Sequence, residues 1–279
     1  MNINQISKIK LSPNIIECIV FWTKDPSKDF IEKLSILNNL GYKYYFQYTL
    51  NPYNKKLELN LPNENDRIKK FINLSERIGK QKVIWRYDPI IINDNYTLDY
   101  QNKNFHDIAE KLSNYTEKCI ISFVDIYKKI QTRLSQNNIY VFDNSTIKTI
   151  AKMLSEISKQ NKIRMDSCCE QIDLSDFGIK HGHCIDCELV NKIVGKEYNF
   201  KKDKTQRDVC GCITSVDIGS YNTCQHKCIY CYANWIDTSN ALNKYDINSP
   251  LLCSEVESND KITERIVQKC DLLEKELFN

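Results

Sequence analysis

The regular alternation of apolar runs with amphipathic segments is the feature that most restricts how this chain can fold. Five runs rich in β-branched and aromatic residues predict buried strands, at 15–22, 44–50, 82–88, 119–124 and 162–165. Segments with apolar residues at helical spacing separate them, at 27–37, 65–78, 105–112 and 145–158, with Ser27 as a helix cap and Gly79 as a helix stop. Near-continuous apolar strands that alternate with helices predict an α/β fold with a parallel sheet or barrel.

The chain has 13 cysteines among 279 residues, and their use depends on the cellular compartment. No apolar run approaches the roughly 18 residues that span a membrane, and the first ten residues contain no apolar signal-peptide core. We therefore expect a cytoplasmic protein with no membrane partner. In that reducing compartment, metal binding or catalysis explains many cysteines better than a disulfide framework does. The net charge of +3 neither indicates nor excludes a nucleic acid partner.

Three cysteines, Cys224, Cys228 and Cys231, follow the spacing Cys-x3-Cys-x2-Cys, and the aromatic Tyr230 precedes the third. Three thiolates within eight residues can hold an iron–sulfur cube or part of a zinc tetrahedron. A cube held by three thiolates has one iron without a protein ligand, and that iron can chelate a small molecule. The spacing therefore predicts a metal site with an open position.

The stretch that contains these cysteines, 219–234, resembles the cluster-binding loop of the radical S-adenosylmethionine (SAM) enzymes, in which an aromatic residue typically precedes the last cysteine. Locally it is similar to the spore photoproduct lyase and DNA repair photolyase-like branch of those enzymes. Over nearly its whole length the chain also resembles an uncharacterised bacterial domain-of-unknown-function family with a C-terminal CxxxCxYCYAN motif. The stretches that match that family are 21–26, 46–49, 85–90, 121–125 and 206–234.

The radical SAM resemblance implies a [4Fe-4S] cluster on Cys224, Cys228 and Cys231, with the backbone around Tyr230 beside the adenine of a bound SAM. Polar residues at or near the carboxyl ends of the predicted strands, where α/β folds collect their chemistry, are candidates to contact SAM or a substrate. They are Thr23, Lys24, Gln47, Arg86, Asp88 and Ser122. Each of them can equally be an exposed loop residue or a buried hydrogen-bonding partner, and Arg86 with Asp88 can be a structural ion pair.

The chain departs from the radical SAM pattern in two ways. It lacks the Gly-Gly-Glu that often holds the methionine moiety, and its cluster loop follows the last predicted strand instead of the first. Because the first and last strands of a barrel are neighbours, a circular permutation explains the second difference. We expect a permuted, partial (β/α)6-type parallel barrel in which 212–218 lies beside the strand at 17–22. Its regions are β/α units at 1–165, a cysteine-rich metal segment with little periodic structure at 166–211, the last strand and cluster loop at 212–239, and a tail at 240–279 with a helix at 261–277.

A second group of cysteines precedes the cluster loop. We expect an auxiliary [4Fe-4S] cluster on Cys168, Cys184, Cys210 and Cys212. The resemblance favours Cys168 over Cys169 and treats Cys187 as an additional cysteine. Four thiolates in such loops also suit a closed structural zinc site, and the cysteines can also be unmetallated.

These features predict an enzyme that reductively cleaves SAM and forms a deoxyadenosyl radical, which takes a hydrogen atom from an unidentified substrate. Its electrons would come from a reductant such as ferredoxin or flavodoxin. The basic stretch 196–207, with Tyr198 and Phe200, permits contact with a nucleic acid but is more typical of a solvated loop. The alternatives are a zinc-stabilised binding module and an iron–sulfur electron carrier without SAM chemistry.

Overall fold

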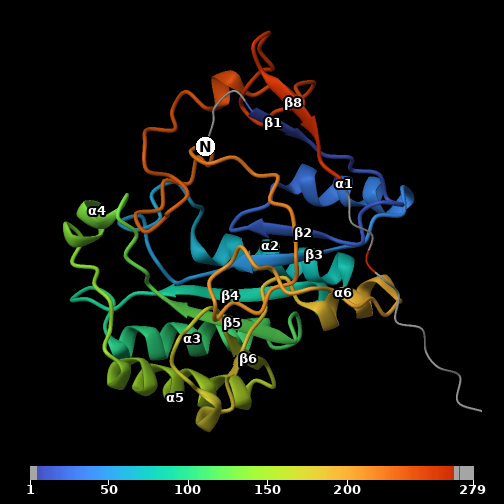
Figure 1. The fold of residues 1–279 in the computed structure, drawn as a ribbon. Coiled ribbons are helices and arrows are strands. Elements are labelled where there is room, and N and C mark those ends of the chain that lie inside the picture. Colours follow the sequence, from blue (N-terminus) through green and yellow to red (C-terminus); the bar gives the residue numbers. More distant parts are fainter. Residues whose placement is uncertain (1–4, 267–269, 271–279) are drawn as a thin grey trace, which may run out of the picture.

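Six parallel strands form the central sheet of the computed structural model, which describes residues 5–266 and residue 270. Hydrogen bonds join the strands in chain order, so that β2 and β7 are the two edges of the sheet. Figure 1 shows β2 to β6 in this order. The α/β class and the parallel sheet predicted from the sequence are confirmed. The strands are β2 (Ile19–Thr23), β3 (Tyr44–Thr49), β4 (Val83–Ile90), β5 (Lys118–Phe123), β6 (Arg164–Ser167) and β7 (Lys180–His181).

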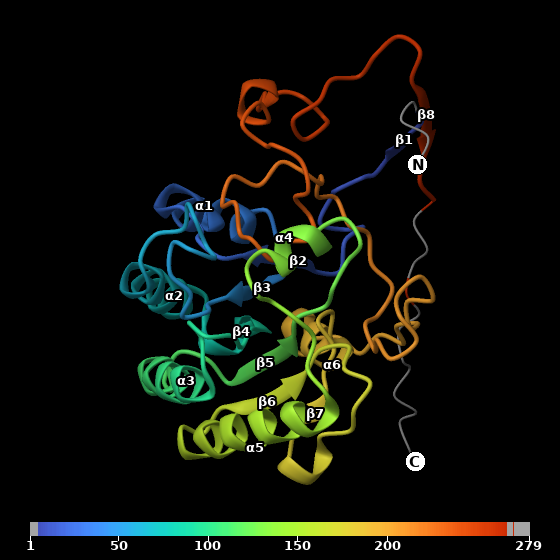
Figure 2. The same cartoon turned by 90° about the vertical axis from the view of Figure 1, so that its left-hand side faces the viewer.

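Helices connect successive strands and cover one face of this sheet (Figure 2). The four long helices are α1 (Lys28–Asn39), α2 (Glu64–Ile78), α3 (Leu98–Leu112) and α5 (Asn144–Gln160). Each begins at a residue whose side chain accepts a backbone N–H of the first turn, as Ser27 does from Phe30 at 3.1 Å. Shorter elements are α4 (Gln131–Ser135) and the 3-10 turns Lys80–Lys82, Ser175–Phe177 and Leu242–Lys244.

The main hydrophobic core lies between the sheet and these helices. Alternate strand residues face it, including Phe46 and Trp85, and the Trp85 ring stacks on Phe105 of α3 with centroids 4.8 Å apart. Full burial of one such side chain stabilises the fold by roughly 1.5–3 kcal/mol. The alternation of side chains along a strand places the intervening residues on the opposite face.

The opposite face of the sheet changes character along the strands. Near their amino ends, Tyr45 and Ile84 pack with Val190 of α6 (Cys187–Val194). Two residues further along the same strands, and therefore on the same face, come Gln47 and Arg86. This opposite face thus becomes polar towards the carboxyl ends of the strands, and this change positions the site described below.

The segment 212–218 is not a strand, so the prediction that it closes a permuted barrel beside β2 is wrong. Its first residues bind cysteine-rich loops instead of the sheet edge. The backbone N–H of Ile213 donates to the carbonyl oxygen of Ile185 at 3.1 Å, and the backbone N–H of Asp203 donates to the carbonyl oxygen of Cys212 at 2.9 Å. These loop contacts use the hydrogen-bonding groups that pairing with β2 would need.

Two further predictions need correction. The region 261–264, expected to begin a helix, is the strand β8 (Lys261–Glu264), which pairs in parallel with β1 (Gln5–Lys8). Most of the rest of that predicted helix lies outside the described residues. The cysteine-rich segment, expected to lack periodic structure, contains both β7 and α6. Within the described residues, no helix combines the length and the apolar character needed to cross a membrane.

Candidate functional site

The cysteine loop 219–234 is attached to the loop that follows β3. The backbone N–H of Ile229 donates to the carbonyl oxygen of Leu57 at 2.8 Å, and the backbone N–H of Asn60 donates to the carbonyl oxygen of His226 at 3.1 Å. Because β3 ends at Thr49, these contacts place the loop near the carboxyl ends of the strands.

Tyr230 fixes this loop through its buried hydroxyl group. Lys24 Nζ donates to the hydroxyl oxygen at 2.9 Å, Asn51 Nδ2 donates at 3.3 Å, and the hydroxyl donates to Glu58 Oε1. Glu58 also pairs with Lys24 at 3.2 Å and with Arg67 at 3.0 Å. Since Glu58 and Arg67 are each only 1% exposed, this group carries one buried carboxylate against two cations. The excess positive charge favours an anionic group nearby.

The three thiols of the loop differ in exposure. Cys224 is exposed, Cys231 is partly buried and Cys228 is buried. Burial raises the pKa of Cys228 to about 12, although the charge of Lys24 opposes this shift. The thiol is therefore protonated at neutral pH, and a metal that bound it would displace the proton. Arg133 adds a further cation, donating to the carbonyl oxygen of Cys231 at 2.6 Å.

The second group of cysteines gathers in one cluster. Cys168 Sγ and Cys184 Sγ lie 3.0 Å apart, and the backbone N–H of Ile185 donates to Cys212 Sγ at 3.4 Å. The pKa of Cys184 is raised to about 11: the hydrogen bond with Cys168 lowers it, whereas the one with Cys212 and burial raise it. The structure thus brings together the four cysteines proposed for the auxiliary site. The members of the cluster are Cys168, Cys169, Cys184, Cys210 and Cys212.

Two cysteines that the sequence left ambiguous are now placed. Cys169 belongs to the cluster and has a positive φ of 56°, whereas Cys187 begins α6 and packs in the separate core that contains Val190. The cluster therefore holds five thiols, one more than the four predicted ligands.

Strand ends position this cluster. Cys168 directly follows β6, and its backbone N–H donates to the carbonyl oxygen of Ile121 at 2.8 Å. Cys184 follows β7, which can approach β6 closely because Gly182 has no side chain. A Cβ at Gly182 would lie 2.9 Å from the carbonyl oxygen of Ser167.

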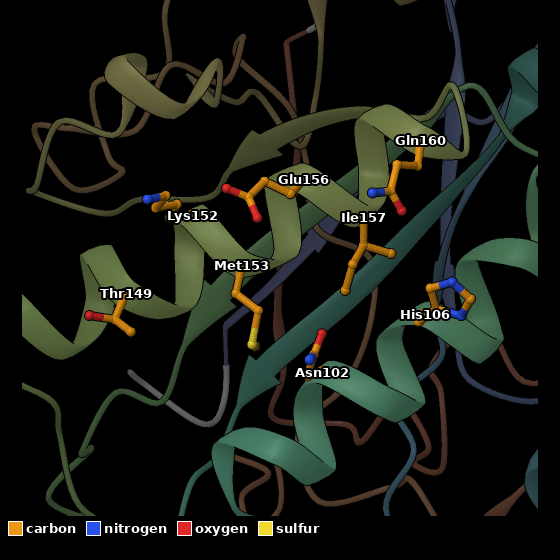
Figure 3. A pocket seen from close by; sticks show the side chains of 8 residues that line it. All are labelled: Asn102, His106, Thr149, Lys152, Met153, Glu156, Ile157 and Gln160. Carbon is orange, nitrogen blue, oxygen red and sulfur yellow. The ribbon is translucent and has the colours of Figure 1, made fainter.

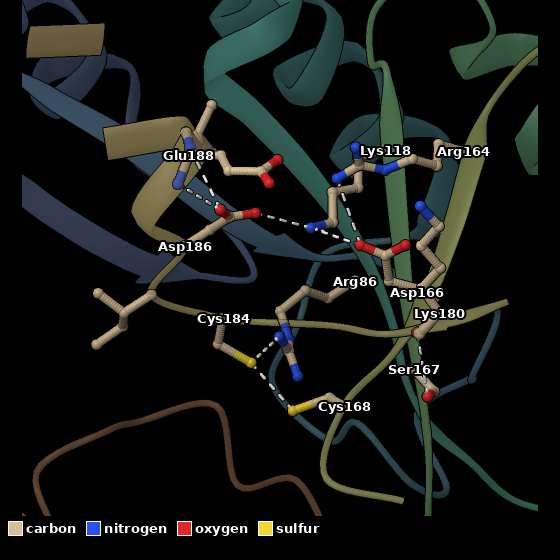
Figure 4. A network of polar contacts seen from close by, with 12 residues as sticks. Arg86, Lys118, Arg164, Asp166, Ser167, Cys168, Lys180, Cys184, Asp186 and Glu188 are labelled. Atoms are coloured by element: carbon tan, nitrogen blue, oxygen red, sulfur yellow. Dashed lines mark hydrogen bonds and ion pairs between the residues drawn. The ribbon is translucent and has the colours of Figure 1, made fainter. Parts of the chain in front are cut away.

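A buried ion pair fastens the cluster to the sheet. Lys118 Nζ of β5 binds Asp166 of β6 at 2.6 Å and Asp186 at 3.1 Å. Asp186 also caps α6 by accepting the backbone N–H groups of its first turn. Figure 4 shows Lys118 between the two carboxylates.

Four of the predicted pocket residues form one network beside this cluster. Arg86 Nε donates to Asp88 Oδ2 at 2.9 Å, and Ser122 donates to Asp88 Oδ1. Gln47 Nε2 donates to the carbonyl oxygen of Cys184 at 2.7 Å. Burial acts to raise the pKa of Asp88, but the charge of Arg86 and the Ser122 hydrogen bond outweigh it, so that this pKa is lowered. Asp88 is therefore an anion at neutral pH.

The other two predicted pocket residues lie elsewhere. Lys24 belongs to the Tyr230 group, whereas the hydroxyl of Thr23 accepts the backbone N–H of Asp25 at 3.2 Å and so closes a local turn.

A comparison with protein families now bears on this arrangement. The family described as Domain of unknown function (DUF1848) matches residues 1–233. The chain belongs to this family. The matched region extends past Cys231, so it contains all the cysteines of both groups. Among curated proteins, the search found no match to the chain.

Several residues of the site were missed by the sequence reasoning. Glu58, Arg67 and Arg133 belong to no motif, and only the fold brings them to the cysteine loop. Glu170 was also missed: its carboxylate accepts the backbone N–H of Phe123 at 2.9 Å, and burial raises its pKa to about 7. Asn51 had a detectable signal, because it is a polar residue just after a predicted strand.

A groove of about 420 Å³ lies elsewhere, between α3 and α5 (Figure 3). Its lining contains no cysteine and none of the residues selected from the sequence, so it does not compete with the cysteine site. The lining residues are Asn102, His106, Thr149, Lys152, Met153, Glu156, Ile157 and Gln160.

Neither cysteine group is arranged around a single metal ion. Among the described residues, no three or more His, Cys, Asp or Glu side chains have such an arrangement. Two thiolates on one zinc ion stand about 3.7 Å apart, from Zn–S bonds of about 2.3 Å, which exceeds the 3.0 Å between Cys168 and Cys184. Metal binding would therefore separate these two thiols and end their hydrogen bond.

Proposed function

We propose that this protein is a radical SAM enzyme that holds one [4Fe-4S] cluster on Cys224, Cys228 and Cys231 and an auxiliary cluster at the second cysteine group. The observation that carries the proposal is the attachment of the Cys-x3-Cys-x2-Cys loop by Tyr230 near the carboxyl ends of a parallel sheet. Ligand-binding and active sites of α/β folds commonly lie at that edge. In this proposal the six strands act as a partial barrel whose face opposite the long helices bears the site.

The charges around the loop support an anionic cluster. Three thiolates on a cubane leave a negatively charged group, and three cations lie close to the loop with one buried carboxylate among them. They are Lys24, Arg67 and Arg133, with Glu58. Removing charges from water is costly unless opposite charges surround them. The loop therefore offers an anion the compensation that a neutral pocket would not.

When bound, the cluster supplies the electron for reductive cleavage of SAM into methionine and a deoxyadenosyl radical. The protein's own residues would bind and orient SAM and exclude water from the site. Tyr230 and Asn51 hold the loop, and Asp88 presents a carboxylate kept anionic by Arg86. We assign Asp88, Ser122 and Gln47 to the wall of the proposed SAM site. A ferredoxin or flavodoxin would supply the electrons.

The experiment is anaerobic purification followed by iron and sulfide analysis, then incubation with dithionite and SAM. We expect brown protein with about eight irons per chain and formation of deoxyadenosine or methionine. The same protein after removal of iron with a chelator is the control and should form neither product. Colourless protein with stoichiometric zinc would support a binding module instead. Iron-loaded protein that leaves SAM intact would support an electron carrier.

A further inference from the structure

Arg86 lies between the two cysteine sites. Its side chain is on the face of β4 opposite the four long helices and is 5% exposed. One guanidinium nitrogen, Nη1, donates to Cys184 Sγ at 3.0 Å, and Nε donates to Asp88 Oδ2 at 2.9 Å. In Figure 4 the guanidinium group points at Cys184, beside Cys168. A buried cation therefore donates directly to a sulfur that we assign as a cluster ligand.

The contacts of Arg86 continue to the cysteine loop. The backbone N–H of Asp88 donates to Asn51 Oδ1 at 2.8 Å, and Asn51 Nδ2 donates to the hydroxyl oxygen of Tyr230 at 3.3 Å. Tyr230 directly precedes Cys231. Hydrogen bonds and the residues that make them thus connect Cys184 of one site with the loop of the other.

The position of Arg86 has an electrostatic consequence for any cluster held by Cys184. Reduction adds a negative charge to the cluster, and a hydrogen bond or positive charge at a ligand sulfur stabilises that charge. Arg86 provides both. Asp88 opposes it, because its carboxylate neutralises part of the guanidinium charge. The low effective dielectric of a buried site strengthens both effects.

We propose that Arg86 raises the reduction potential of the auxiliary centre and that Asp88 limits the increase. The inference rests on the proposed function, because it requires iron at the second site. Arg86 acts here as a positioning and tuning residue through the Cys184 sulfur. In the step that we would measure, dithionite gives one electron to the centre, and no protein bond forms or breaks.

The test uses full-length protein with Cys228→Ala, so that the loop contributes no cluster signal. The EPR signal of the reduced auxiliary centre is followed against the ambient potential at equilibrium. We expect Arg86→Met to lower the potential, Arg86→Lys to lower it less, and Asp88→Asn to raise it. Arg164→Met is the matched control: this arginine is 56% exposed and pairs with Asp166 of the same polar network. It should leave the potential unchanged.

The two substitutions are expected to change the reduction potential in opposite directions, and this distinguishes tuning from disruption of the site. A structural role alone would shift the reduction potential in the same direction in Arg86→Met and Asp88→Asn. That result would overturn the inference, and so would unchanged potentials in iron-loaded variants. If Arg86→Met fails to take up iron, Arg86→Lys and Asp88→Asn still decide it. Native protein without iron would overturn the proposed function, and this inference with it. Iron-loaded native protein with unmoved variants would overturn this inference alone.

Discussion

Tyr230 shows how one hydroxyl group can attach a loop to a sheet. It is the common partner of Lys24, Asn51 and Glu58, and these residues come from two different strand ends and the loop beyond them. The aromatic residue before the third cysteine was selected because radical SAM loops contain one there. Its side chain, however, points into the protein and packs with Tyr53, with ring centroids 5.9 Å apart.

Replacing Tyr230 with Phe should lower the free energy of unfolding by ~1–3 kcal/mol, because buried charged and polar groups lose a partner. The measurement is urea unfolding of the metal-free protein under reducing conditions. Tyr221→Phe is the control, since that ring belongs to the same loop but is 53% exposed. Its effect should stay within about 0.5 kcal/mol. Equal effects of the two substitutions would show that the Tyr230 hydroxyl does not hold the loop.

Gly182 controls the second site by allowing close packing. A Cβ there would meet the backbone of Ser167 and the side chain of Asp166, both at 2.9 Å. We expect Gly182→Ala to cost about 1–3 kcal/mol and to reduce iron uptake, because β7 must move and Cys184 follows it. Gly219→Ala is the control, since this exposed glycine lies outside the second site and the atom nearest to its added Cβ would be a side-chain oxygen of Asp217, at 3.1 Å. Full iron content in Gly182→Ala would contradict the requirement for close packing.

Elements were predictable where a local pattern agreed with the fold. The alternation of apolar strands and amphipathic helices gave the strands β2 to β6 and the helices α1, α2 and α5 within a few residues, including the cap at Ser27 and the stop at Gly79. The prediction failed at 212–218, whose sequence resembles a strand but whose backbone binds the loops around Ile185 and Asp203. It also failed at 261–264, where pairing with β1 overrides the helical spacing.

The gathering of the second cysteine group could be predicted only in part. Cys168 was identifiable because it follows a strand, but the two-residue strand β7 before Cys184 has no apolar pattern of its own. Glu58 and Arg67 could not be found, because a buried ion pair depends on the positions of a loop and a helix that no local signal relates.

Lys118 joins three elements, β5, β6 and the start of α6. Replacing it with Met would remove the buried cation that Asp166 and Asp186 share, and Asp166 would keep its exposed partner Arg164. We expect a loss of ~3–5 kcal/mol in the free energy of unfolding, as for other broken buried ion pairs. Arg164→Met removes the exposed partner of the same Asp166, at 3.4 Å, and should cost less than about 1 kcal/mol. Urea unfolding measures both, and similar losses would contradict the role of Lys118 in attaching α6.

At the scale of the whole molecule, the two cysteine groups belong to different segments but are connected through the end of the sheet. The loop group lies within 219–234, and the second group is contributed by segments after β6 and β7 and by residues 210–212. Arg86, Asp88 and Asn51 connect them. Each site nevertheless has its own attachment, through Tyr230 for the loop and through Lys118 for the second group, so that each should survive loss of the other.

Cysteine substitutions test this independence. Cys228→Ala and Cys184→Ala should each remove about four of about eight irons, because each deletes a buried ligand of one cluster only. SAM cleavage should be abolished in Cys228→Ala and retained in Cys184→Ala, since only the loop leaves an iron open to the cofactor. Cys187→Ala is the control: it begins α6 outside both groups, and it should keep all the iron and the cleavage. Complete loss of iron in either ligand variant would show that the two sites form one cooperative unit.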